Sequence, residues 1–119
     1  MEEFLEEITE KIIGVMRTNQ FKAHAVLLET LISIIFHVEI KIEPFTEQLL
    51  EVIMEQVKNE DSLTKKVAID AIYAITAIVK DQMIPYRLQI LHSLKDLKCH
   101  KVKPVREAAG ETYKLLKEL

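Results

Sequence analysis

The 119-residue sequence is poor in the residues that break helices or cross-link chains: it has two glycines, three prolines and one cysteine. Strand-rich folds need many turns, so this scarcity argues against them and favours long helices joined by short loops. Cys99 has no second cysteine with which to form an internal disulfide. A reducing compartment is therefore the simplest expectation.

The sequence also lacks the marks of membrane insertion and of secretion. No apolar run approaches the ~20 residues that span a bilayer. Four glutamates within residues 2–7 occupy the place where a signal peptide carries positive charge. We therefore expect a cytoplasmic protein with no membrane partner.

The residues that are abundant are typical of a folded helical domain. Apolar residues make up 49% of the chain and charged residues 29%, a balance found in globular rather than disordered proteins. Leu, Ile, Glu, Lys and Ala dominate, and all of these except isoleucine are strong helix formers. A chain of this length can form one core but not two, so we expect residues 1–119 to be a single domain.

An internal repeat organises the chain into units of about 1–41, 42–82 and 83–119. A shift of 41 residues aligns apolar positions with apolar positions: Phe4, Phe45 and Tyr86; Ile8, Leu49 and Ile90; Ile12, Ile53 and Leu94; Leu31, Ile72 and Tyr113; Ile34, Ile75 and Leu116. The same shift aligns polar positions, namely His24, Lys65 and Arg106, and also Glu29, Asp70 and Glu111. An unrelated six-helix bundle is the alternative, but it would not explain polar matches at one fixed offset.

Within each unit the apolar residues recur every three to four positions, which predicts two antiparallel helices. We expect the first helices at about 2–17, 44–58 and 84–98, and the second helices at about 20–38, 62–80 and 102–118. Pro44 and Pro85 suit the first turn of a helix, where no intrahelical N–H bond is lost. Asp61 and Ser62 are candidates to cap the helix that follows them.

The repeat length and the second helices resemble HEAT repeats, with residues 64–72 and 105–109 similar to the HEAT consensus. This resemblance implies an all-α fold, an α-solenoid of three stacked hairpins. Apolar residues near the two ends would then lack a neighbour: Phe36, Ile40, Ile42, Leu115, Leu116 and Leu119. We expect either a piece of a longer array or self-association through a terminal unit. Gly110, which replaces Leu28 and Ile69 of the other units, indicates either drift in a terminal unit or close backbone approach by a neighbour.

Positive charge collects where the two helices of each unit meet. Residues 17–22, 58–66 and 98–106 hold nine of the sixteen Lys and Arg residues but only two of the nineteen Asp and Glu residues. Stacked hairpins place these segments along one side of the array, which we call the loop edge. The sequence thus predicts a basic loop edge on an otherwise acidic protein.

Residues 19–31 resemble the opening loop and helix of TOG domains, the HEAT-repeat modules of microtubule polymerases and rescue factors. Residues 101–109 are similar to the N-terminal HEAT region of the plant tortifolia family of microtubule-associated proteins. In the TOG family the intra-repeat loops contact tubulin through one aromatic and several basic residues. The resemblance implies tubulin binding, with Phe21 as the apolar anchor and Lys22, Lys65, Lys101, Lys103 and Arg106 as the charged contacts. Phe stands where TOG domains have Trp, and His24 where they have Arg.

Structural roles compete with this interpretation. Phe21 can pack under its own loop. Lys65 and Arg106 occupy the basic position that HEAT repeats use for pairing between repeats. Lys101 and Lys103 lie at a predicted helix N-terminus, where the helix dipole disfavours positive charge. These two residues have the weaker structural explanation and are the better candidates for a ligand.

Patterns typical of catalysis, metal binding or cofactor binding are missing. Cys99 and His100 are adjacent and have no second pair nearby, so neither a metal site nor a cysteine nucleophile is expected. Gly14 and Gly110 cannot form a phosphate-binding loop. We therefore predict a protein with no enzymatic activity and no cofactor.

Three functions remain open. The first is a TOG-like interaction module that binds tubulin or another acidic protein through its loop edge. The second is a HEAT scaffold in a larger assembly, with its partner on the helical faces and no cytoskeletal role. The third is nucleic-acid binding, which is disfavoured because only Phe21 is available for base stacking among the basic loops and the net charge is −3.

Overall fold

The computed structural model describes residues 7, 10–11, 24–38 and 43–119. Every regular element in this part of the chain is helical, which confirms the all-α class. The α-helices are α2 (His24–Val38), α3 (Thr46–Val57), α4 (Ser62–Val79), α5 (Arg87–Lys95) and α6 (Lys103–Lys117). The predicted helix at 2–17 and residues 20–23 of the next one lie largely outside the described residues.

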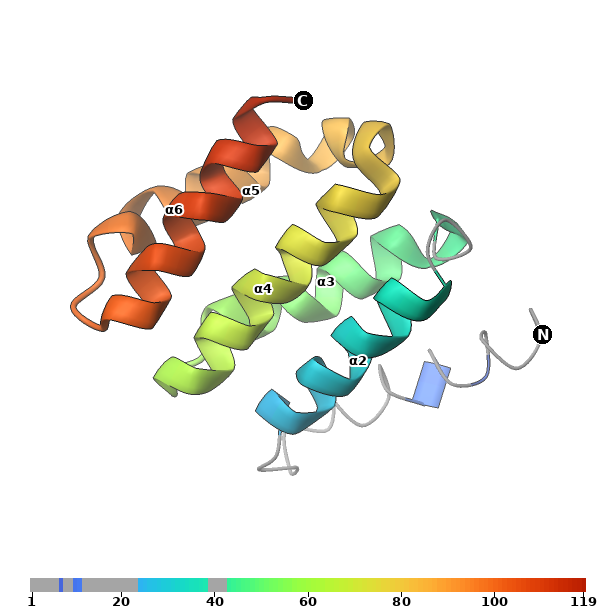
Figure 1. Cartoon of the computed structure of the whole chain (residues 1–119), viewed down its shortest axis with the longest axis horizontal. Coiled ribbons are helices and arrows are strands. Elements are labelled where there is room, and N and C mark those ends of the chain that lie inside the picture. The colour runs from blue at the N-terminus through green and yellow to red at the C-terminus, as the bar shows by residue number, and fades with distance from the viewer. Residues whose placement is uncertain (1–6, 8–9, 12–23, 39–42) are drawn as a thin grey trace.

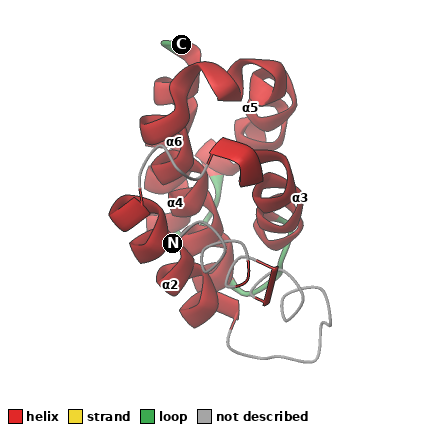
Figure 2. Ribbon diagram, turned by 90° about the vertical axis from the view of Figure 1, so that its right-hand side faces the viewer, coloured by secondary structure: helices red, strands yellow, loops and turns green. Residues whose placement is uncertain are grey.

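The helices form two layers (Figures 1 and 2). Helices α2, α4 and α6 run side by side in one layer, with α4 packed against α2 on one side and α6 on the other. Helices α3 and α5 form the second layer, where α3 packs on α4 and α5 packs on α6. Each second-layer helix thus covers the helix that follows it in the chain.

The core lies between the layers and consists of aliphatic side chains at matching positions of the repeat. Leu49 and Ile90 are both buried, as are Ile53 and Leu94 on the same helices. Ile72 and Ile75 of α4 are fully buried, because α4 packs against α2 and α6 within its layer and against α3 of the second layer. Burial of a side chain of this size stabilises the fold by about 1.5–3 kcal/mol.

The predicted helix at 84–98 is wrong as a continuous α-helix. A 3-10 helix covers Lys80–Tyr86, α5 occupies Arg87–Lys95, and a second 3-10 helix covers Asp96–Cys99. Pro85 lies inside the first of these 3-10 helices rather than in the first turn of α5. Proline disfavours α geometry at the residue before it and has no N–H to donate, so the α-helix begins only after Tyr86. Pro44 lies likewise in a 3-10 turn at 43–45, just before α3.

One expectation about the last unit is also wrong, and one of the two alternatives for Gly110 finds no support among the described residues. Leu116 is fully buried rather than left bare, Leu119 is half-buried against the core, and Leu115 is half-buried. A Cβ added to Gly110 would meet no atom within 4 Å, so no described residue approaches its backbone closely. Phe36 of α2 is exposed as expected, whereas Ile40 and Ile42 lie outside the described residues.

No helix in the described ranges is long and apolar enough to cross a bilayer.

Candidate functional site: the basic loop edge

The starts of α2, α4 and α6 lie at the same side of their layer, which places residues 58–66 and 98–106 next to each other along the loop edge (Figure 1). The remaining predicted segment, residues 17–22, lies outside the described part of the chain. Its two predicted contact residues, Phe21 and Lys22, therefore also lie outside it. The structure therefore describes two of the three predicted basic segments, residues 58–66 and 98–106. We call Lys58, Lys65 and Lys66 the second-unit cluster, and Lys98, Lys101, Lys103 and Arg106 the third-unit cluster.

The start of α4 is stabilised by its own residues. Asp61 is the N-cap, as predicted: its Oδ2 accepts hydrogen bonds from the Thr64 backbone N–H at 3.0 Å and from the Thr64 hydroxyl at 2.7 Å. These two bonds favour the ionised carboxylate and lower the pKa of Asp61. The negative charge also complements the helix dipole at this end.

Two of the three lysines in the second-unit cluster are engaged within their own unit. Lys65 Nζ donates to the Val57 carbonyl oxygen at 2.6 Å, which ties the start of α4 to the end of α3. Burial lowers the pKa of Lys65. Lys66 Nζ lies 2.6 Å from a carboxylate oxygen of Asp70, one turn further along α4. The exposed Lys58 is the C-cap of α3, where a positive charge suits the helix dipole.

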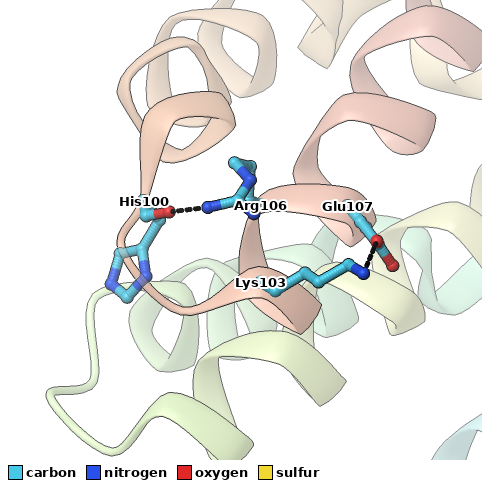
Figure 3. A network of polar contacts seen from close by, with 4 residues as sticks. All are labelled: His100, Lys103, Arg106 and Glu107. Carbon is cyan, nitrogen blue, oxygen red and sulfur yellow. Dashed lines mark hydrogen bonds and ion pairs between the residues drawn. The ribbon is translucent and has the colours of Figure 1, made fainter.

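The start of α6 is built differently. Its N-cap is Val102, which has no side chain able to cap, and Pro104 occupies the first turn. The imidazole of His100 takes part of the capping role, because its Nδ1 accepts a hydrogen bond from the Val102 N–H at 3.0 Å. The carbonyl oxygen of His100 accepts a second bond, from Arg106 Nη1 at 3.1 Å (Figure 3). His100 thus organises this loop, a role that nothing in the sequence pattern indicated.

The lysines of the third-unit cluster differ in how firmly they are held. Lys98 Nζ lies 3.7 Å from the ring centroid of Tyr113, a cation–π contact that holds this charge against the helix. Lys103 Nζ is 3.7 Å from a Glu107 carboxylate oxygen, and both side chains are largely exposed (Figure 3). Exposed pairs of this kind contribute little, about 0.2–1 kcal/mol. Lys101 is exposed and has no hydrogen-bond or ion-pair partner among the described residues.

The structure thus separates the predicted contact residues. Lys65 and Arg106, which occupy equivalent repeat positions, each donate to a backbone carbonyl of the preceding loop or helix end. Lys101 and Lys103 remain accessible at the N-terminus of α6. Within the described ranges, no group of three or more His, Cys, Asp or Glu side chains is arranged to hold a metal ion, and Cys99 is an exposed free thiol.

Comparison with known protein families gives one match that spans almost the whole chain. The model described as TORTIFOLIA1 N-terminal matches residues 1–118. No curated protein is significantly similar to the chain. With this match and the helical fold together, the chain belongs to the TORTIFOLIA1 N-terminal family, the N-terminal region of plant tortifolia-type microtubule-associated proteins.

Proposed function

We propose that this chain is a protein-interaction module that binds tubulin through its basic loop edge. The observation that carries the proposal is the open start of α6, where Lys101 is unpartnered within the described part and Lys103 is held by one exposed ion pair. Positive charge at a helix N-terminus is unfavourable for the helix itself. An acidic protein surface would compensate this cost, and the family suggests a microtubule-associated context, which supports tubulin as the partner.

We propose further that residues 1–119 form one α-solenoid domain of three HEAT-type hairpins. The pairing of α3 with α4 and of α5 with α6 supports this arrangement, as does the placement of α4 between α2 and α6. Stacking of this kind aligns the starts of the second helices, so three short basic segments act as one extended surface. Such an open surface suits binding rather than catalysis, and we assign the chain no enzymatic role. The association with tubulin would place it in the cytoplasm, at the cytoskeleton.

In this proposal the predicted contact residues have unequal roles. Lys101 and Lys103 make the principal charged contacts, with Lys22 and Phe21 contributing from the first unit. Arg106 adds a contact from its exposed guanidinium while it holds the His100 carbonyl. Lys65 acts mainly within the fold, because its ammonium is half-buried and bonded to Val57.

The test is gel filtration and fluorescence anisotropy with unpolymerised tubulin, at low and moderate salt. Charge reversal of Lys101 and Lys103 together should weaken binding about tenfold or more, equivalent to about 1.4 kcal/mol. Rim charges act chiefly on the association rate, and screening shortens their reach to ~8 Å at physiological ionic strength. Binding of the native chain should therefore weaken as salt is added.

The matched control is the pair Lys114→Glu and Lys117→Glu. Both residues are exposed and lie in the last turn of the same helix, away from the loop edge, and the net charge changes equally. This control should retain binding. Equal losses in the two double variants would reduce the effect to net charge and refute the loop edge as the binding surface.

A scaffold role with a partner on the helical faces is the second candidate. The exposed apolar side chains of Leu88 (76% exposed) and Ile84 (47%) favour it, since they lie one turn apart on the 3-10 helix and α5. Tubulin binding that survives Lys101→Glu/Lys103→Glu but is lost in Leu88→Asp would support this alternative.

A further inference from the structure

A groove of about 400 Å³ separates α3 from the segment Tyr86–Ile90. None of its lining residues comes from the layer of α2, α4 and α6. Leu50, Met54 and Ile90 give it an apolar floor, with Met54 the most accessible of the three. The groove therefore lies in the second layer. It is lined by Lys58 of the second-unit cluster, at the end of α3, and by none of the third-unit cluster.

One wall of the groove is acidic. Glu47, Glu51 and Glu55 line it, and each is exposed. They follow one another at intervals of four residues on α3, which spaces them by about 6 Å along the helix axis. Neither Glu47 nor Glu55 has a hydrogen-bond or ion-pair partner among the described residues.

Glu47, Glu51 and Glu55 place three like charges on one side of α3. Like charges four residues apart on a helix are destabilising by a few tenths of a kcal/mol per pair. The repeat keeps them only in part, because the equivalent positions hold Glu6, Glu10 and Gly14 in the first unit and Leu88, His92 and Asp96 in the last. A cationic partner would remove the repulsion and fill the apolar floor at the same time.

We propose that this groove is a second docking surface, which takes a basic amphipathic helical segment of another protein. Lys or Arg side chains two turns apart on such a segment would meet the carboxylates of Glu47 and Glu55, and an apolar side chain would contact Met54. The charge of the groove is opposite to that of the third-unit cluster, so one acidic partner cannot satisfy both surfaces. The inference is independent of the tubulin proposal, and the chain could bridge an acidic and a basic partner.

The probe is a fluorescein-labelled synthetic peptide of about 14 residues, about 21 Å long as a helix, with Arg every fourth position and Leu beside it. Anisotropy titration should show binding to the native chain, and an equivalent peptide with Glu in place of Arg should not bind. The variant Glu47→Gln/Glu55→Gln should weaken binding about tenfold. Met54→Gln, which keeps the side-chain length but removes the apolar contact, should weaken it about threefold.

Glu111→Gln/Glu118→Gln is the matched control, because both glutamates are exposed on or next to α6 and the same two charges are removed. It should bind the peptide within twofold of the native chain. Amide chemical-shift changes on peptide addition should fall on α3 and on residues 86–90. Equal weakening in the two double variants, or shift changes centred on the loop edge, would overturn the proposal.

Two further outcomes separate the alternatives. Sedimentation velocity that shows a dimer lost in both Glu47→Gln/Glu55→Gln and Lys101→Glu/Lys103→Glu would assign the groove to a second copy of this chain and refute the peptide proposal. Loss of tubulin binding in Lys101→Glu/Lys103→Glu with peptide binding intact would support both proposals as separate surfaces.

Discussion

The starts of α4 and α6 occupy the same place in the repeat but use their charges in opposite ways. At α4 the carboxylate of Asp61 caps the helix, Lys65 is bonded to the end of α3, and Lys66 is paired along the helix. At α6 the N-cap is Val102, and Lys101 extends into solvent beside it. The first start stabilises the fold, whereas the second carries positive charge that the helix does not need.

This difference shows why a basic residue at a repeat position is ambiguous by itself. Lys65 and Arg106 align in the sequence, and each donates a hydrogen bond to a backbone carbonyl of its own unit, so their repeat position by itself predicts a structural role. The residues that distinguish the two starts lie just before the helices: Asp61 in one unit and Lys101 in the other. The sign of the charge relative to the helix dipole is therefore more informative than the repeat alignment.

The largest expected effect is on the free energy of unfolding, at two equivalent positions of α4 and α6. Ile72 of α4 is fully buried, whereas its equivalent in α6, Tyr113, is half-buried under Lys98 and Lys117. Ile72→Ala should lower the free energy of unfolding by about 2–5 kcal/mol, because it leaves a cavity in the core. Tyr113→Ala should cost only about 1–2 kcal/mol. Urea denaturation of both variants measures the difference, and equal losses would contradict the distinction between an inner and an outer helix.

A smaller effect is expected at the hydrogen bond that joins Lys65, at the start of α4, to Val57, at the end of α3. Lys65→Met keeps the apolar stem but removes the bond to the Val57 carbonyl, so it should lower stability by less than about 1 kcal/mol. The gain from the bond is partly offset in the native chain, since burial already disfavours the ammonium and lowers the pKa of Lys65. Thermal unfolding should show a lower Tm, while tubulin affinity stays within about twofold. A large loss of tubulin binding in Lys65→Met at unchanged Tm would return Lys65 to the contact surface.

The smallest expected effect is the acid dependence of the α4 cap. The pKa of Asp61 is lowered in the folded state, first by the Thr64 hydroxyl and then by the Thr64 N–H. The stability this gives is fully present above the ordinary carboxyl pKa and is lost as pH falls through the lowered value, in the range below about pH 4. Asp61→Asn keeps a capping oxygen but cannot titrate there. The Tm difference between the native chain and Asp61→Asn should shrink as pH is lowered from 6 to 3, and a constant difference would show that Asp61 does not act through its charge.

The helical class and most of the helix bounds could be predicted from the sequence. The spacing of apolar residues is set within each helix, and the 41-residue repeat shows the same spacing in each unit. The predicted bounds of α4 and α6 agree with the structure within one residue, and Asp61 was identified as the cap. The break around α5 is not predicted by the sequence pattern, because a proline before an apolar helical pattern fits the first turn of an α-helix as well as the 3-10 helix in which Pro85 lies.

The candidate site was predictable only in part. Charge counting identified the loop edge, and dipole reasoning singled out Lys101 and Lys103. The roles of His100 and of the Lys98–Tyr113 contact depend on how the loop closes onto α6, which spacing along the chain does not encode. The acidic groove could not be predicted from the sequence, because it forms only when the fold brings α3 and residues 86–90 together.

The most direct test of the open start of α6 is a map of where tubulin touches the chain. Amide NMR spectra of the isotope-labelled protein, recorded with substoichiometric unpolymerised tubulin, would report each residue by its loss of signal intensity. We expect the strongest losses at residues 99–106, weaker losses at 58–61, and little change in α3. Losses centred on α3, on the exposed face of α5 around Leu88, or spread evenly over the helices would contradict it.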